Sequence, residues 1–247
     1  MASAAGSVLI AFPVVFVVFL GLGIYRSALG FGLTVFDSIG LSLVSASVAC
    51  LVDVALFTPL AYELSRKRNK IMESFTDIPA SIPHPIVGIA LLALDSPVTP
   101  VGRFLLSLGI NFFDTFLGLV TALTIVSAPI YIRSIQSHLS AKTVEPEWFA
   151  SGMGASRLRI LMSVVLPSSL KELVSSALTS MSRALSEFGS IAIVAYYVLQ
   201  APFKGVEPAS VLVYQYYGYY GPQVAFTAAA TMILLSLPVM LVARLLG

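Results

Sequence analysis

The residues best able to do chemistry in this chain are four ionisable side chains inside long apolar stretches: Asp53, Asp114, Arg183 and Glu187. Charges inside a membrane helix are costly, and such residues commonly pair with one another or mark a substrate path. Arg183 and Glu187 lie four residues apart and can meet on one helix face. They could lock helix packing as a pair, or Arg183 could contact an anion passing through the protein. Asp53 and Asp114 would repel an anion, so we expect them to pair with hydroxyls, backbone groups or a cation, or, for Asp114 near the outer end of its span, to reach water.

The remaining reactive residue types do not suggest an enzyme or a metal protein. His84 and His138 lie far apart with no metal-ligand spacing, and Cys50 is the only cysteine, so we expect no metal site and no internal disulfide. The chain has no H-E-x-x-H pattern, no nucleophile with its base, and no G-x4-G-K-[ST] loop to hold nucleotide phosphates. We therefore predict that it is not an enzyme and has no cofactor of its own.

The composition places these residues in a membrane protein. Hydrophobic residues make up 57% of the chain, charged residues 11%, and the mean hydropathy is +0.94, whereas soluble domains carry roughly a quarter charged residues. The net charge of +2 is too small to suggest a nucleic acid partner. Residues 1–247 show no linker and no internal repeat, so we expect one all-α membrane domain. Because many transporters carry two related halves in one chain, the absence of a repeat indicates that another subunit completes the path.

Six stretches approach the roughly 20 apolar residues that a helix needs to cross a bilayer. They are Val8–Tyr25, Ile39–Tyr62, Ile78–Leu94, Phe112–Ile132, Leu173–Tyr197 and Pro222–Val242. The first lacks a basic leader and a clear cleavage site, so we expect it to be retained rather than removed as a signal peptide. Ten Lys and Arg residues follow the second, fourth and sixth stretches, against three on the opposite side. This excess predicts a multi-pass protein of the cell membrane with both termini in the cytoplasm.

Three prolines, Pro79, Pro83 and Pro85, stand at the start of the third stretch. Proline removes a backbone N–H, so they predict a bent entry into this helix, or a kink that widens a cavity or moves with a gate. His84 lies among them and could sense charge or be a packed polar residue.

The loop Arg133–Pro167 predicts two short helices on the cytoplasmic face. Pro146 fits the first position of the first helix, because its missing N–H costs nothing there. Gly152 and Gly154 can end this helix, since glycine accepts left-handed backbone angles.

The second helix of this loop is expected over Arg157–Leu166, capped by Ser156. Pro167 would break it. Ser169 and Glu172 have the spacing of a capping box and would start the fifth membrane helix.

The spacing within this loop matches G-x9-[IV]-x-L-P at Gly154, Val164, Leu166 and Pro167. It resembles the cytoplasmic motif of importer-type ABC transporter permeases, usually written E-A-A-x3-G-x9-I-x-L-P. Three further segments are similar to oxyanion permeases, in particular the molybdate/tungstate branch: Arg183-Ala184-Leu185-Ser186-Glu187-Phe188-Gly189, Pro59-Leu60-Ala61-Tyr62 and Pro79-x3-Pro83-His84-Pro85.

Two places depart from the pattern of this family. Trp148, Phe149 and Ala150 stand where the family has Glu, Ala and Ala, so only Ala150 matches, and Glu147 comes one place early. Ser186 stands where the family has glycine.

The resemblance implies a type I ABC importer permease with six transmembrane helices and a cytoplasmic coupling helix. ATP and Mg would bind a partner ATPase, present in two copies beside two copies of this chain and an extracytoplasmic oxyanion-binding protein. The residues implied to dock on the ATPase are Glu147, Trp148, Phe149, Ala150, Ser151, Gly152, Gly154 and Ala155. The candidates for the pathway or its gate are Arg183, Ser186, Glu187 and Phe188.

Three functions stay open from the sequence. The resemblance favours import of molybdate or tungstate, and sulfate or another small oxyanion is the alternative. A channel or secondary transporter would explain the apolar stretches, but it would not explain the G-x9-[IV]-x-L-P loop.

Overall fold

The long apolar runs of this chain form helices, as a computed structural model shows for residues 2–27, 30 and 32–246. Within these residues all regular structure is helical, apart from one isolated bridge between Val198 and Val206. The helices are α1 (Ala2–Phe19), α2 (Leu33–Arg66), α3 (Lys70–Ser81), α4 (His84–Leu94), α5 (Pro100–Ser107), α6 (Phe116–Ala141), α7 (Glu145–Gly152), α8 (Arg157–Ile160), α9 (Leu166–Ser168), α10 (Leu170–Leu185), α11 (Ile191–Val194), α12 (Ala209–Tyr220) and α13 (Pro222–Leu246). Two π-helical segments, Leu20–Tyr25 and Leu161–Val165, continue α1 and α8.

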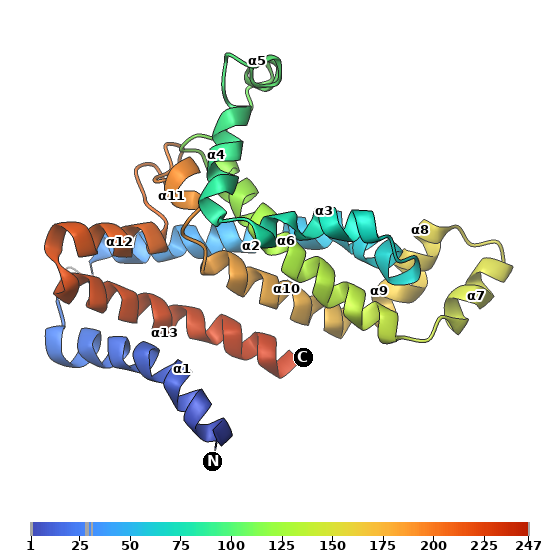
Figure 1. Cartoon of the computed structure of the whole chain (residues 1–247), viewed down its shortest axis with the longest axis horizontal. Helices are drawn as coiled ribbons and strands as arrows, with labels where there is room; N and C mark the ends of the chain where they lie inside the picture. The colour runs from blue at the N-terminus through green and yellow to red at the C-terminus, as the bar shows by residue number, and fades with distance from the viewer. Residues whose placement is uncertain (1, 28–29, 31, 247) are drawn as a thin grey trace.

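The long helices lie side by side along one axis (Figure 1). One end of the bundle carries α7, α8 and α9. We call it the basic end because Arg66, Lys142 and Arg157 line grooves beside these helices. The other end carries α12, and α4 and α5 project sideways from the bundle.

Helices α2, α6 and α10 form the centre of the bundle. Small residues such as Ala46, Ala49 and Ala122 are fully buried there and allow the helices to approach closely. Asp53 is also fully buried and accepts hydrogen bonds from the hydroxyls of Ser127, at 2.7 Å, and Ser180. The expectation that Asp53 pairs with hydroxyls is confirmed, and these bonds join all three helices.

Among the described residues, three helices are long and apolar enough to cross a membrane unbroken: Gly6–Tyr25, α2 and α6. Two bent pairs, α3 with α4 and α8–α9 with α10, would raise the number of spans to five. The sixth predicted stretch lies on α13, a helix of 25 residues. The prediction of several apolar helices is confirmed, but not as six continuous helices.

The third predicted stretch, Ile78–Leu94, is wrong as a continuous helix. Helices α3 and α4 meet at 103°, and the break lies at Ile82 and Pro83. A residue before proline is disfavoured in helical geometry, and Pro83 has no N–H to donate, so the chain turns here. The predicted bent entry is confirmed, and α4 alone has too few residues to cross a bilayer.

The fifth predicted stretch, Leu173–Tyr197, is also broken. Helix α10 ends at Leu185, and α11 forms a separate short helix. The cause is local: Glu187 Oε1 accepts hydrogen bonds from Ser190 N at 2.9 Å and Ser190 Oγ at 3.0 Å. The Ser190 N–H has no helical carbonyl partner, and the Glu187 carboxylate accepts its hydrogen bond instead. The chain can therefore turn here rather than continue as a helix.

The predicted loop at the basic end contains the two expected helices. Helix α7 begins at Glu145, one residue before Pro146, and Gly154 has the left-handed φ of +82°. Ser156 caps α8 by accepting a hydrogen bond from Arg159 N at 3.4 Å. These three expectations hold to within one residue.

The expected capping box is wrong, and so is the break at Pro167. Pro167 lies inside α9, and the chain bends after it, at Ser169. Ser169 makes no side-chain cap, because its Oγ is 3.0 Å from Lys142 Nζ. Lys142 Nζ also lies 3.4 Å from Glu172 Oε1. This lysine, which follows α6, therefore contacts both side chains that were expected to form the capping box.

The packing of α13 on the first helix yields a stability prediction. A Cβ added at Gly21 would lie 2.2 Å from the carbonyl oxygen of Phe226, whereas a Cβ at Gly6 would meet nothing within 4 Å. We expect Gly21→Val to destabilise the protein by about 1–3 kcal/mol through overpacking and to lower the melting temperature in detergent. Gly6→Val is the matched control, and equal melting curves for the two variants would contradict this packing.

Candidate functional site

Helix α7 presents an apolar surface at the far basic end of the molecule (Figure 1). The side chains of Trp148 and Phe149 are 69% and 76% exposed, and Met153, Leu158 and Met162 are exposed beside them. We call these five residues the α7 patch. Their exposure leaves these apolar side chains available for contact with something outside this chain.

The predicted docking residues divide between the outside and the inside of α7. Ser151, Gly152 and Gly154 are exposed like the α7 patch, and Ala155 is partly buried. Ala150 is buried among apolar residues of the basic end, and Glu147 is also buried. The structure therefore groups most of these residues on one surface but turns Glu147 and Ala150 toward the bundle.

Glu147 holds α7 against α2. Its Oε1 lies 2.6 Å from Arg66 Nη2, and Arg66 Nε donates to both carboxylate oxygens at 3.1 Å. Tyr62 Oη donates to Oε2 at 2.8 Å, and Arg66 Nη1 donates to the Leu139 carbonyl oxygen at 2.6 Å. One guanidinium thus ties α7 and the end of α6 to the end of α2 by charge-assisted bonds.

This ion pair was not predicted from the sequence. Tyr62 and Arg66 are one helical turn apart at the end of a predicted span, which places both on one face. Their partner Glu147 is 81 residues away from Arg66 in sequence. A groove of about 660 Å³ opens beside the pair, lined among others by Trp148 and Arg157.

A second polar cluster lies where the two broken helices meet. Arg183, at the end of α10, has its Nη2 2.9 Å from Glu187 Oε2. His84, at the start of α4, has its Nδ1 2.9 Å from the same oxygen and 2.8 Å from Arg183 Nη2. Arg183 Nη1 donates to Ser186 Oγ at 3.0 Å. The predicted pairing of Arg183 with Glu187 is confirmed, and His84 joins it.

The other predicted pathway residue, Phe188, faces a different environment. Its ring lies 5.2 Å from the ring of Tyr214, beside an apolar groove of about 370 Å³. The structure therefore brings Arg183, Ser186 and Glu187 together and places Phe188 against α12.

Asp114 pairs with backbone groups, as expected, in the loop before α6. Its N–H donates to Val194 O at 2.8 Å, and its carbonyl accepts from Leu199 N at 3.0 Å. Burial raises the pKa of the Asp114 carboxyl, and hydrogen bonds from the backbone of Tyr197 and Tyr196 act in the opposite direction. These contacts join the start of α6 to the segment after α11.

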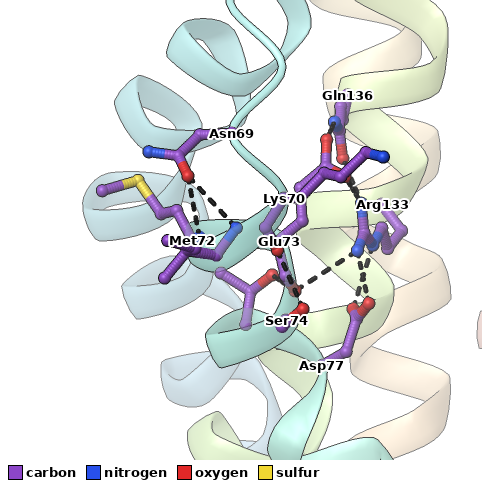
Figure 2. Close-up of polar contacts among 10 residues, drawn as sticks. Asn69, Lys70, Met72, Glu73, Ser74, Asp77, Arg133 and Gln136 are labelled. Atoms are coloured by element: carbon purple, nitrogen blue, oxygen red, sulfur yellow. Dashed lines mark hydrogen bonds and ion pairs between the residues drawn. The ribbon is translucent and has the colours of Figure 1, made fainter.

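Helix α3 is held along α6 by the cluster in Figure 2. Arg133 donates from Nε to Asp77 Oδ1 at 2.9 Å, and its Nη2 contacts the other carboxylate oxygen. Gln136 Nε2 donates to Glu73 Oε1 at 2.8 Å, and Asn69 caps the start of α3. These bonds fix α3 on the basic side of its break and so position His84.

Comparison with known proteins agrees with this arrangement. Residues 54–247 match the family described as binding-protein-dependent transport system inner membrane component. The chain is 32% identical to the molybdate/tungstate transport system permease protein WtpB of Pyrococcus furiosus, over 85% of this chain and 77% of the relative. It is also 32% identical to WtpB of Thermococcus kodakarensis, over 85% and 78%.

Similarity extends to a sulfate permease and to a solved structure. The sulfate transport system permease protein CysT of Synechocystis is 29% identical, over 83% of this chain and 71% of the relative. A chain of the inward-facing MetNI methionine ABC transporter superposes with a TM-score of 0.62, covering 86% of this chain and 96% of that one. Their sequence identity is 18%, so this match concerns the fold alone.

The Glu147–Arg66 pair yields a prediction on the mobility of α7. We expect Glu147→Gln to weaken the attachment of α7 by on the order of 2 kcal/mol, because hydrogen bonds between charged groups are replaced by weaker ones. Hydrogen exchange of the α7 amides should become faster, while the centre of α6 stays protected.

Glu145→Gln is the matched control, because Glu145 is an exposed carboxylate in the first turn of the same helix. The exchanged pair Glu147→Arg with Arg66→Glu should recover part of the protection. Unchanged exchange in Glu147→Gln would show that the pair does not hold α7.

Proposed function

Because this chain belongs to the family of binding-protein-dependent transport system inner membrane components, we propose that it is the permease of an ATP-driven importer for molybdate or tungstate. We propose this substrate because the chain is 32% identical to molybdate/tungstate permeases over most of both chains. The chain is then a transport subunit rather than an enzyme.

Sulfate is the second candidate substrate. The sulfate permease of Synechocystis is 29% identical to the chain, only slightly less than the molybdate/tungstate relatives. Molybdate, tungstate and sulfate are all tetrahedral dianions, so one pathway could pass any of them. An external binding protein would then select the anion.

The α7 patch is the surface proposed to dock on the ATPase. Its exposed aromatic residues, Trp148 and Phe149, are of the kind that anchor protein interfaces. The many Lys and Arg residues near this end support a cytoplasmic location, where an ATPase would have access to ATP and Mg. Both chain termini would lie in the cytoplasm.

The attachment of α7 supports a way to transmit motion. Glu147 and Arg66 join α7 to α2, and Arg66 also holds the end of α6. A force on α7 would therefore move the ends of two central helices together. When the ATPase closes on ATP, two copies of α7 would be drawn together and the bundles of two permease chains would rearrange.

The pathway is proposed to pass Arg183, Ser186, Glu187 and Phe188, between two copies of this chain. Charged side chains inside a membrane protein face a partner or an aqueous path rather than lipid. An extracytoplasmic binding protein would deliver the anion at the end that carries α12.

Coupling is tested with two variants in proteoliposomes that contain the ATPase and the binding protein. Loss of an interface anchor costs about 2 kcal/mol or more, roughly thirtyfold in affinity. We expect Trp148→Ala to lower ATP-driven uptake at least about tenfold, while ATP hydrolysis persists without coupling to it. Gly154→Leu should act similarly, because φ at this position is +82° and disfavours a side chain.

Val98→Ala is the control for these variants, since Val98 is an exposed apolar residue in the loop between α4 and α5. Wild-type coupling in both Trp148→Ala and Gly154→Leu would refute docking through the α7 patch.

The substrate is tested in the same proteoliposomes. We expect molybdate- or tungstate-loaded binding protein to stimulate ATP hydrolysis and uptake several-fold more than sulfate-loaded protein. Stimulation by sulfate alone would favour the sulfate permease. Uptake that proceeds equally without ATP would indicate a channel or secondary transporter.

A further inference from the structure

One face of α10 is polar although the helix lies in the centre of the bundle. Ser175, Thr179, Ser182 and Ser186 follow one another at intervals of three or four residues, which places them on one side of the helix. Thr179 and Ser186 are exposed, and their hydroxyls donate to carbonyls of α10 itself, at 2.9 Å and 2.8 Å. Small hydroxyl residues on one helix face suit a close neighbour or a polar path, and this face ends at the charged side chain of Arg183.

This polar face leads from the basic end to the cluster of Arg183, His84 and Glu187. At about 1.5 Å per residue, Arg183 lies about 20 Å along the axis from Leu170, the first residue of α10. The two-helix segment from Lys70 to His84 has a similar length. Both lengths are shorter than the roughly 30 Å thickness of the hydrocarbon core of a bilayer, so helices that enter from the basic end would break inside it. Interrupted helices at this depth are the usual place for transported ions to bind.

The cluster is arranged with the guanidinium and the imidazole outward and the carboxylate inward. The side chain of Glu187 is 1% exposed, whereas those of Arg183 and His84 are 22% and 32% exposed. The second oxygen of Glu187 is occupied by Ser190. An anion that approached along α10 would therefore meet the guanidinium and the imidazole before the carboxylate.

We propose that Arg183 and His84 together form a contact site for a tetrahedral oxyanion in the translocation path, and that Glu187 limits its affinity. This inference rests on the proposed function and adds His84 to the path. Arg183 alone would attract a dianion strongly in a medium of low dielectric. Conduction requires the anion to leave again, and Glu187 lowers the attraction by neutralising part of the charge behind the site.

The relative positions of the three side chains depend on close backbone packing. A Cβ at Gly88 on α4 would lie 2.5 Å from the carbonyl oxygen of Ser190. A Cβ at Gly189 would lie 3.0 Å from Pro85 Cδ. The two glycines therefore let α4 approach the turn before α11 closely, and His84 is brought within hydrogen-bond distance of residues about one hundred positions away.

The site is tested by adding sodium molybdate to the detergent-purified permease–ATPase complex, without ATP and without binding protein. Molybdate should raise the melting temperature of the wild-type complex relative to sodium chloride at equal ionic strength. His84→Gln should weaken the apparent molybdate affinity by about tenfold, whereas Glu187→Gln should strengthen it by a similar factor.

These opposite signs separate an anion site from a purely structural cluster, in which both substitutions would only lower the melting temperature without molybdate. His138→Gln is the control, because His138 is exposed on α6 near the basic end. If molybdate does not stabilise the wild-type complex, or if His84→Gln and Glu187→Gln change its affinity in the same direction, the proposal is refuted.

Uptake in proteoliposomes distinguishes this proposal from the proposed function. His84→Gln should reduce the anions transported per ATP hydrolysed by several-fold, while the complex assembles and the binding protein still stimulates hydrolysis. Wild-type transport per ATP in this variant would overturn the site and leave the importer intact. Absence of ATP-driven uptake in the wild type would instead overturn the importer.

Discussion

Inside a bilayer, a backbone N–H or carbonyl that leaves a helix finds no water, and the protein must supply its partner. This constraint explains why the polar side chains of this bundle gather where helices break. The Glu187 carboxylate accepts from Ser190 at the end of α10, and the Asp95 carboxylate accepts from Phe112 N and Phe113 N after α5. The break after α10 therefore brings buried and partly buried charged side chains together. One of them, Arg183, has the positive charge that would attract an anion.

Continuous helices join the proposed docking surface to the proposed anion site. Helix α10 begins beside Lys142 at the basic end and carries Arg183 in its last turn. Helix α2 ends at Arg66, which holds α7, and carries Asp53 at the centre. Helices α2, α6 and α10 are joined by close packing and by the bonds of Asp53. A displacement of α7 would therefore move these helices together and reach the cluster of Arg183, His84 and Glu187.

Features that rest on local sequence were largely predictable. The short helices around Gly154 and the cap at Ser156 depend on backbone angles and on a hydroxyl three residues from its partner. The helical pairing of Arg183 with Glu187 depends on a spacing of four. The capping box at Ser169 failed for the opposite reason, because a distant residue, Lys142, competes for both of its side chains.

By itself, the sequence determined the membrane environment, the all-helical class and the resemblance to importer permeases, since these follow from composition and from motifs of neighbouring residues. Only the tertiary structure decided that Glu147 turns inward to Arg66, and that His84 meets Arg183 at the junction of two broken helices. Such contacts join residues roughly eighty to one hundred positions apart. Which residues meet in these contacts depends on how the helices cross and bend. The periodicity of one helix does not indicate which residue of another helix will lie beside it.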